Sequence, residues 1–265
     1  MLPSLRGDPK KPAALRDTFR LLRESGFAGV EVRGSMNQRE VLAARDASGL
    51  EIPSVVVAAH WTHPMTSPNP ATRATGLEGL RQALRDAKAY GADSVLLVPG
   101  VVNQESPYDV ALALAKAGIR AALPLAESLG VAIAIENVWN KFLLSPLEAA
   151  AFVDAFQSPL VRWHFDVGNV VDTGWPEQWI RILGPRIVKV HVKEYSRQLR
   201  DERGPRAGFE AGLMTGDSDW PAVMRALDEM GYAGWMITEQ YRPPGLTDAA
   251  WLQRLSGELD RLLAL

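Results

Sequence analysis

Short apolar runs alternate with longer amphipathic stretches along this chain, and that alternation limits the fold more than any other feature. The predicted strands are almost wholly apolar, as strands covered on both faces must be. They cover residues 29–32, 52–59, 94–98, 132–135, 161–165, 187–190 and 235–238. The predicted helices cover residues 13–25, 37–48, 71–90, 108–129, 146–156, 176–183, 219–230 and 247–265.

Many of the predicted helices end in a glycine directly before the next strand. A glycine commonly ends a helix because, without a Cβ, it adopts the left-handed conformation at little cost. The glycines at these positions are Gly26, Gly49, Gly91, Gly130, Gly184 and Gly231. Repeated helix-to-strand turns of this kind predict a parallel sheet with right-handed crossovers.

These elements predict a (β/α)₈ TIM barrel, in which eight parallel strands close into a cylinder inside a ring of helices. Only seven strands are visible, and the missing first strand would precede Ala13, so we expect it to be truncated at the N-terminus. An open doubly wound sheet would need a glycine-rich phosphate loop after its first strand, which the sequence lacks. No linker interrupts the chain, so residues 1–265 are predicted to form one domain.

Composition excludes several other classes of protein. The chain has no cysteine, so disulfides and thiolate metal sites are excluded. Its 29 basic and 31 acidic residues are mixed, which argues against nucleic-acid and membrane partners. No apolar run is long enough to span a bilayer, and the first residues lack the apolar core of a signal peptide. We therefore expect a cytoplasmic protein.

Four consecutive predicted strands end on residues that commonly bind metals: Glu136, Asp166, His191 and Glu239. The catalytic side chains of a barrel lie where its strands end, and neighbouring strands are about 4.8 Å apart. These four side chains are therefore predicted to meet at one cation. Three carboxylates and one imidazole suit Mn²⁺, Mg²⁺ or Co²⁺ better than a structural zinc, and they leave positions open for substrate oxygens.

The chain resembles the sugar phosphate isomerase/epimerase superfamily, the xylose-isomerase-like barrels that include tagatose 3-epimerases, hydroxypyruvate isomerases and inosose dehydratases. The resemblance extends from Ala13 onward and rests on the order and strand-end placement of its motifs. Those motifs are Gly26-Phe27-Ala28-Gly29-Val30-Glu31, Ile135-Glu136-Asn137, Phe165-Asp166-Val167-Gly168-Asn169, His191-Val192-Lys193-Glu194 and Gly216-Asp217-Ser218-Asp219-Trp220, followed by Glu239.

The resemblance implies an enzyme that isomerises or epimerises a small keto sugar or sugar phosphate through an enediolate. It implies that Glu136, Asp166, His191 and Glu239 bind one divalent cation, with Mn²⁺ favoured and Mg²⁺, Co²⁺ or Zn²⁺ as alternatives. Both glutamates would also act as catalytic acid and base, and a homodimer or homotetramer is expected. Epimerases of the tagatose type have a histidine where this chain has Asn169, so substrate contacts inferred from that subgroup are open.

Six further residues are candidates for binding substrate, because they lie on or just beyond strand ends. Each also has a structural alternative, such as an ion pair, a hydrogen bond within a loop or ordinary packing. Residues 193–206 are expected to form a solvated loop. The six candidates are Glu31, His60, Trp139, Asn169, Lys193 and Arg197.

Three other functions remain open on the sequence. A metal-dependent dehydratase of the inosose or dehydroshikimate type would use the same ligands to expel a hydroxyl group. An endonuclease IV-like hydrolase would need more histidines than the four present, as well as a basic DNA-binding face. A sugar-binding barrel without catalysis is the third alternative.

Overall fold

The computed structural model describes residues 12–265, which contain one parallel seven-stranded sheet. Its strands are hydrogen-bonded in chain order, so each β–α unit lies beside the one before it. The strands are β1 (Val32–Arg33), β2 (Ser54–Val56), β3 (Ser94–Leu97), β4 (Ala132–Glu136), β5 (Val161–Asp166), β6 (Ile187–Val192) and β7 (Trp235–Thr238).

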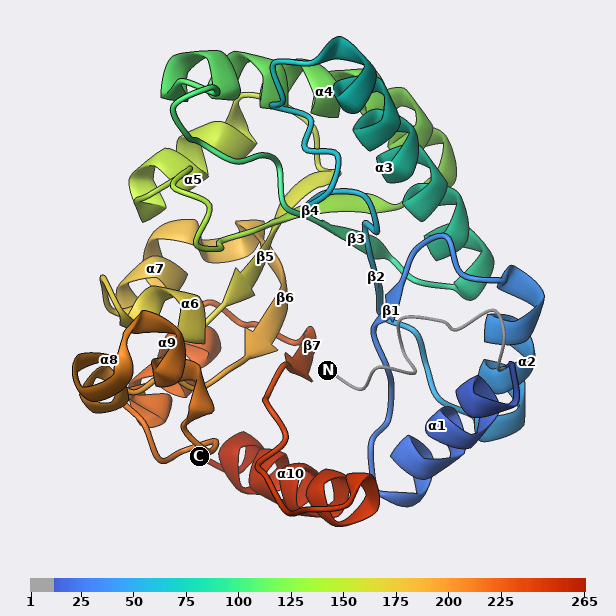
Figure 1. Cartoon of the computed structure of the whole chain (residues 1–265), viewed down its shortest axis with the longest axis vertical. Coiled ribbons are helices and arrows are strands. Elements are labelled where there is room, and N and C mark those ends of the chain that lie inside the picture. The colour runs from blue at the N-terminus through green and yellow to red at the C-terminus, as the bar shows by residue number, and fades with distance from the viewer. Residues whose placement is uncertain (1–11) are drawn as a thin grey trace.

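Helices follow the strands and cover the outside of the sheet (Figure 1). They are α1 (Pro12–Glu24), α2 (Gln38–Ser48), α3 (Pro70–Tyr90), α4 (Tyr108–Leu129), α5 (Pro146–Asp154), α6 (Gly168–Val171), α7 (Pro176–Leu183), α8 (Arg197–Arg203), α9 (Trp220–Glu229) and α10 (Asp248–Leu263), with short 3₁₀ turns η2 (Gly184–Arg186) and η3 (Pro205–Glu210). None of the helices within residues 12–265 is long and apolar enough to cross a membrane.

Figure 1 shows the strands curled around a central axis, with the helices as an outer ring. The predicted TIM-barrel fold is therefore confirmed, and all seven predicted strands are present. Within the described residues, β7 and β1 are the two edges of the sheet and do not pair with each other. The predicted eighth strand would precede α1, and that part of the chain lies outside the described residues.

The predicted glycine turns are confirmed at several helix ends. Gly91 and Gly130 have φ angles of 82° and 66°, and each donates its backbone N–H to the last carbonyls of the helix before it. An L-residue rarely adopts this conformation, so glycine lets the chain turn directly from helix into strand. The next strand then starts within a few residues, which keeps the strand ends at one level.

The gap between the two edge strands β7 and β1, here called the seam, is narrowed by the Trp235 side chain. A Cβ added to Gly29 would lie 2.9 Å from the Trp235 ring and 3.0 Å from the Glu51 carbonyl oxygen. Glycine at position 29 therefore allows the indole of β7 to contact the chain that leads into β1. The rest of the seam is a cavity of about 550 Å³, lined mainly by apolar residues that include Leu22 and Trp251.

Two expectations about local structure were wrong. The strand predicted at residues 29–32 is shifted to Val32–Arg33 as β1, although Gly29 still forms a parallel bridge to Glu51. An edge strand has a neighbour on one side only, which makes its ladder short. Residues 193–206 are not simply a loop, because they contain α8, whose first turn is capped by the Ser196 side chain.

Candidate metal centre

The four predicted ligands come together at the carboxyl ends of four neighbouring strands. Glu136 and Asp166 are the last residues of β4 and β5, and His191 lies in β6 opposite Asp166. Glu239 follows β7 and extends its ladder by donating a hydrogen bond from its N–H to the Val192 carbonyl, at 3.1 Å. One potential ligand atom from each side chain lies within 4.8 Å of the ligand atoms of the other three.

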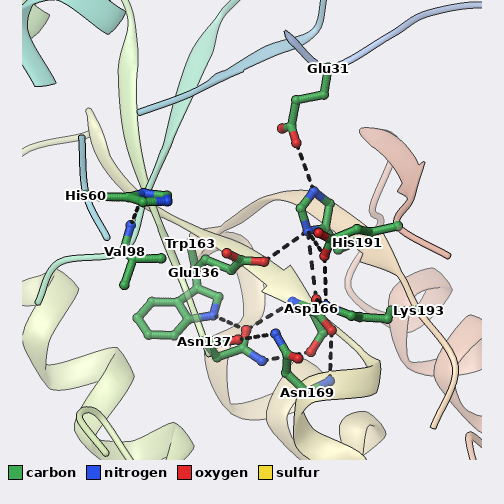
Figure 2. A network of polar contacts seen from close by, with 11 residues as sticks. Glu31, His60, Val98, Glu136, Asn137, Trp163, Asp166, Asn169, His191 and Lys193 are labelled. Carbon is green, nitrogen blue, oxygen red and sulfur yellow. Dashed lines mark hydrogen bonds and ion pairs between the residues drawn. The ribbon is translucent and has the colours of Figure 1, made fainter. Parts of the chain in front are cut away.

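The His191 imidazole is the centre of this cluster, as Figure 2 shows. Its Nδ1 lies 3.0 Å from a Glu136 oxygen, 3.8 Å from an Asp166 oxygen and 3.9 Å from a Glu239 oxygen. Its Nε2 faces the other way and lies 3.1 Å from Oε2 of Glu31. The two ring nitrogens therefore have different partners, and three carboxylates share the Nδ1 side.

The three carboxylates of the cluster differ in pKa, because burial and neighbouring charges affect each of them differently. Desolvation raises the pKa of Glu136 to about 7, against the lowering effect of its hydrogen bond to His191. Burial also raises the pKa of Asp166. Burial acts in the same direction on Glu239, but the positive charges of Lys193 and His191 outweigh it and lower the pKa of Glu239.

His191 and Lys193 supply the positive charge that the buried acids require. Burial lowers the pKa of His191, but the charges of Glu31 and Glu136 outweigh that effect and raise it well above its usual value. The Lys193 amino group lies 2.8 Å from a Glu239 oxygen and 3.4 Å from an Asp166 oxygen. The predicted candidate Lys193 is therefore part of the cluster.

Two asparagines hold the chain around Asp166 in place. The Asn137 side chain donates to the Asp166 carbonyl at 2.7 Å and accepts from the Asp166 N–H at 3.0 Å and from the Trp163 indole at 3.1 Å. Asn169 donates its N–H to the Asp166 carboxylate at 2.8 Å and its side-chain amide to the Asn137 carbonyl at 2.9 Å. These contacts join β4 to β5 next to two of the ligands (Figure 2).

The other predicted substrate-binding residues lie in different surroundings. His60 is 7% exposed, and its ring accepts a hydrogen bond from the Val98 N–H rather than contacting the four ligands. Burial, with a smaller effect of the Arg33 charge, lowers the pKa of His60 to about 4, so its ring is neutral at pH 7. Trp139 is exposed and donates its indole N–H to the Asn169 carbonyl at 2.9 Å.

Arg197 begins α8 and lies farther from the ligands along the chain. Its backbone N–H donates to the Asp217 carboxylate at 2.6 Å, and its guanidinium donates to the Gly174 carbonyl at 3.3 Å. No contact between the Arg197 side chain and the four ligands is present among the described residues. Its position fits a role at the rim of the barrel mouth rather than at the cation.

Two residues at the site were given no functional role from the sequence. Glu194 is completely buried beyond β6, and His164 lies in β5 with its ring 4.1 Å from the His191 ring. The motif around Glu194 was visible, but apart from the adjacent Tyr195 N–H its hydrogen-bond donors are 20 or more residues away in the chain. His164 lies two residues before Asp166, and this alternation is the signal that both side chains face the same side of the strand.

The donor set fits a divalent cation. Oxygen and imidazole ligands about 2.1 Å from one ion lie within roughly 4.2 Å of one another. The four ligand atoms already lie within 4.8 Å of each other, so shifts of a few tenths of an ångström would bring them onto one ion. Three carboxylates with one imidazole also match the preference of hard cations for oxygen.

The chain is thus a parallel barrel whose strand ends bring carboxylates and an imidazole together, and barrels of this class could hold a metal ion there. The family model described as "Xylose isomerase-like TIM barrel" matches residues 19–257. The chain belongs to this family, and the resemblance predicted from its motifs is confirmed.

Individual relatives are more distant. An L-ribulose-5-phosphate 3-epimerase from Salmonella paratyphi A is 24% identical over 220 residues, covering 82% of this chain and 74% of the relative. The crystal structure of a 3-keto-D-glucoside 4-epimerase from E. coli superimposes with a TM-score of 0.76 at 17% identity, covering 95% of this chain and 94% of that one. A structure of an L-ribulose 3-epimerase has a TM-score of 0.76 at 18% identity, covering 95% and 89%. The structural likenesses support the fold.

Proposed function

We propose that this chain is a divalent-metal-dependent isomerase or epimerase that acts on a small keto sugar or sugar phosphate. The observation that carries the proposal is the convergence of Glu136, Asp166, His191 and Glu239 within 4.8 Å of one another. The relatives that cover most of the chain are named as sugar 3- and 4-epimerases, which supports epimerisation as the reaction.

These four side chains would hold the cation, with Mn²⁺ as the favoured ion. A bound divalent cation supplies Lewis acidity, which polarises the carbonyl and neighbouring hydroxyl oxygens of an α-hydroxy ketone. The carbon that bears this hydroxyl group then carries a more acidic hydrogen. What the chain itself must provide is a base to remove that proton and an acid to return one.

Glu136 and Glu239 are placed to share this work. In the sheet β5 and β6 lie between their strands, so the two carboxylates approach the centre from different directions. One takes the proton from the carbon, and the electron pair of the C–H bond moves toward the carbonyl to give an enediolate. The other donates a proton to the opposite face, which restores the carbonyl and inverts the centre. Return of the proton to the neighbouring carbon would instead interconvert a ketose and an aldose.

Lys193 has a supporting role in this proposal. Its amino group lies beside Glu239 and Asp166, where a positive charge favours the ionised carboxylates that a cation and a base both require. The barrel mouth also contains the candidates Trp139 and Arg197, which we propose contact the part of the sugar away from the reacting carbon.

Solvent-hydrogen exchange tests the function directly. The purified protein with Mn²⁺ is incubated in D₂O with a panel of keto sugars and their phosphates, and products are followed by NMR. We expect deuterium at the carbon beside the carbonyl and an inverted or isomerised product, both abolished by EDTA and restored by Mn²⁺. Loss of water would indicate the dehydratase instead, and absence of any exchange across the panel would contradict catalysis.

Substitution of one catalytic carboxylate completes the test. Glu239→Gln should fold normally and lose at least about 10³-fold in turnover, because the amide cannot move a proton. Glu229→Gln is the matched control, since Glu229 is exposed and forms its ion pair with Arg181, away from the four candidate ligands. Near-normal turnover by Glu239→Gln would rule out the proposed role.

A further inference from the structure

The His191 imidazole is held on the side that faces away from the other ligands. Its Nε2 lies 3.1 Å from Oε2 of Glu31, while its Nδ1 faces Glu136 and Asp166 (Figure 2). The Glu239 carboxylate lies on the same Nδ1 side. Glu31 directly precedes β1, so this contact crosses the seam of the barrel from one edge of the sheet to β6. Glu31, next to one edge of the sheet, thus reaches the only imidazole among the four candidate ligands.

Glu31 has little else to stabilise it. Its side chain is 7% exposed, and its second oxygen, Oε1, has no hydrogen-bond partner within residues 12–265. A buried carboxylate is costly unless it is paired, so the contact with His191 is what compensates its burial. The backbone around Glu31 is fixed as well, because the Val30 N–H donates to the Glu51 carbonyl at 2.9 Å and the Glu51 N–H donates to the Ala28 carbonyl at 3.0 Å.

His164 restricts the imidazole from a second direction. Its ring is completely buried and meets the His191 ring edge to face, with centroids 4.1 Å apart and planes at 64°. Neither His164 nitrogen has a hydrogen-bond partner in the described part of the chain. His164 therefore acts on His191 by packing, and Glu31 alone distinguishes Nε2 from Nδ1 by a hydrogen bond on that side.

We infer that Glu31 is a positioning residue: it accepts the Nε2–H of His191 and so keeps the Nδ1 lone pair directed at the cation. Histidines that bind metals commonly donate their other N–H to a carboxylate, which fixes the tautomer and the ring orientation. The inference rests on the proposed function, since it requires that the cluster binds a cation. Of the two roles that the sequence left open for Glu31, contact with the sugar and a structural ion pair, the inference favours the second.

A measurement of Mn²⁺ affinity distinguishes the positioning role of Glu31 from contact with the sugar. Apo protein is titrated with Mn²⁺, and free Mn²⁺ is measured by its EPR signal. We expect Glu31→Met, which has a similar length but cannot accept the hydrogen bond, to weaken Mn²⁺ binding by about 10- to 100-fold. Glu31→Gln retains an acceptor oxygen and should lose less. Glu51→Gln is the matched control, because Glu51 is exposed on the neighbouring segment, and it should bind like the wild type.

A spectroscopic readout excludes a purely structural effect. Pulsed EPR of bound Mn²⁺ detects the ¹⁴N of a coordinated imidazole, and we expect this signal in the wild type and its weakening in Glu31→Met at saturating metal. Circular dichroism should show the same helix content in each variant. Together these measurements test the position of the ring rather than the integrity of the fold.

Three outcomes would overturn the inference, and they differ in what they say about the proposed function. Wild-type Mn²⁺ affinity in Glu31→Met, with the nitrogen signal unchanged, contradicts the inference alone. Unchanged Mn²⁺ affinity together with a raised KM for the sugar would indicate that Glu31 contacts the sugar instead. Failure of the wild type to bind Mn²⁺, Co²⁺ or Zn²⁺ contradicts the metal centre itself, and the inference falls with it.

Discussion

Glu194 organises the chain beyond the acidic cluster by accepting four hydrogen bonds. Its buried carboxylate accepts from the N–H groups of Tyr195 and Ser218 at 3.1 Å, from the Met214 N–H at 2.9 Å and from the Trp220 indole at 2.9 Å. These donors come from both sides of η3, and Trp220 begins α9. One side chain therefore joins two of the motifs that carry the family resemblance.

Removing this carboxylate should destabilise the protein strongly. Glu194→Ala leaves three backbone N–H groups and one indole without their acceptor, at a cost of about 3–4 kcal/mol. For a chain of this size that corresponds to a fall in Tm of roughly 6–15 °C, measurable by calorimetry. Glu202→Ala is the control, because Glu202 is exposed on α8 and should change Tm little. An unchanged Tm for Glu194→Ala would contradict the role assigned to Glu194.

Single residues also show where sequence reasoning stops. The convergence of the four candidate ligands was predictable, since each ends an apolar strand and strand ends meet at one face. The supporting contacts were not, because they depend on pairs far apart in the chain. The Asn137 amide, for example, contacts the Asp166 backbone, 29 residues further along the chain. Glu31 and His191 are 160 residues apart.

At the scale of elements, apolar runs predicted the later strands of the sheet most closely. β3 to β7 lie within a residue or two of their predicted bounds, and the candidate ligands lie in or directly after β4 to β7. α8 was missed because its sequence RQLRDER is mostly charged and no residue of the helix is buried, so no apolar face marked it. Its signal was the capping residue Ser196, which polar loops also contain.

The seam between β7 and β1 gives a prediction about packing. Gly29→Ala places a methyl group 2.9 Å from the Trp235 ring and 3.0 Å from a backbone oxygen, so the edge of the sheet must shift. We expect a loss of about 1–3 kcal/mol in the free energy of unfolding, measured by denaturant titration.

A second glycine provides the control for that experiment. Gly257 lies within α10, and a Cβ there meets no atom within 4 Å. Gly257→Ala should therefore raise stability by up to about 1 kcal/mol through helix propensity. If Gly29→Ala is as stable as Gly257→Ala, the close contact across the seam is not required.

For the whole molecule, the acidic cluster makes stability depend on pH when no metal is bound. The pKa of Glu136 is raised from 4.5 to about 7, so the folded state keeps a proton that the unfolded state has already released in this range. Stability from this group is complete below pH 4.5 and is lost as the pH rises toward 7.

Glu136→Gln should remove that loss, because glutamine does not titrate. In EDTA, the free energy of unfolding of the variant should rise relative to the wild type by about 2–3 kcal/mol between pH 5 and pH 8. Urea titrations at several pH values measure the difference. Parallel pH profiles for the two proteins would show that Glu136 is not the group responsible.

Within the described residues, His191 is contacted from two parts of the sheet, the edges β1 and β7, that are not hydrogen-bonded to each other. Glu136 and Asp166 are tied together through Asn137 within the hydrogen-bonded part of the sheet, whereas Glu31 approaches from the other edge, two residues after Gly29, which packs against Trp235. If these two edges moved apart, Glu31 would move away from the His191 imidazole, while Asn137 would still hold Glu136 and Asp166 together. We therefore expect the packing of these two edges to determine how firmly the His191 ring is oriented.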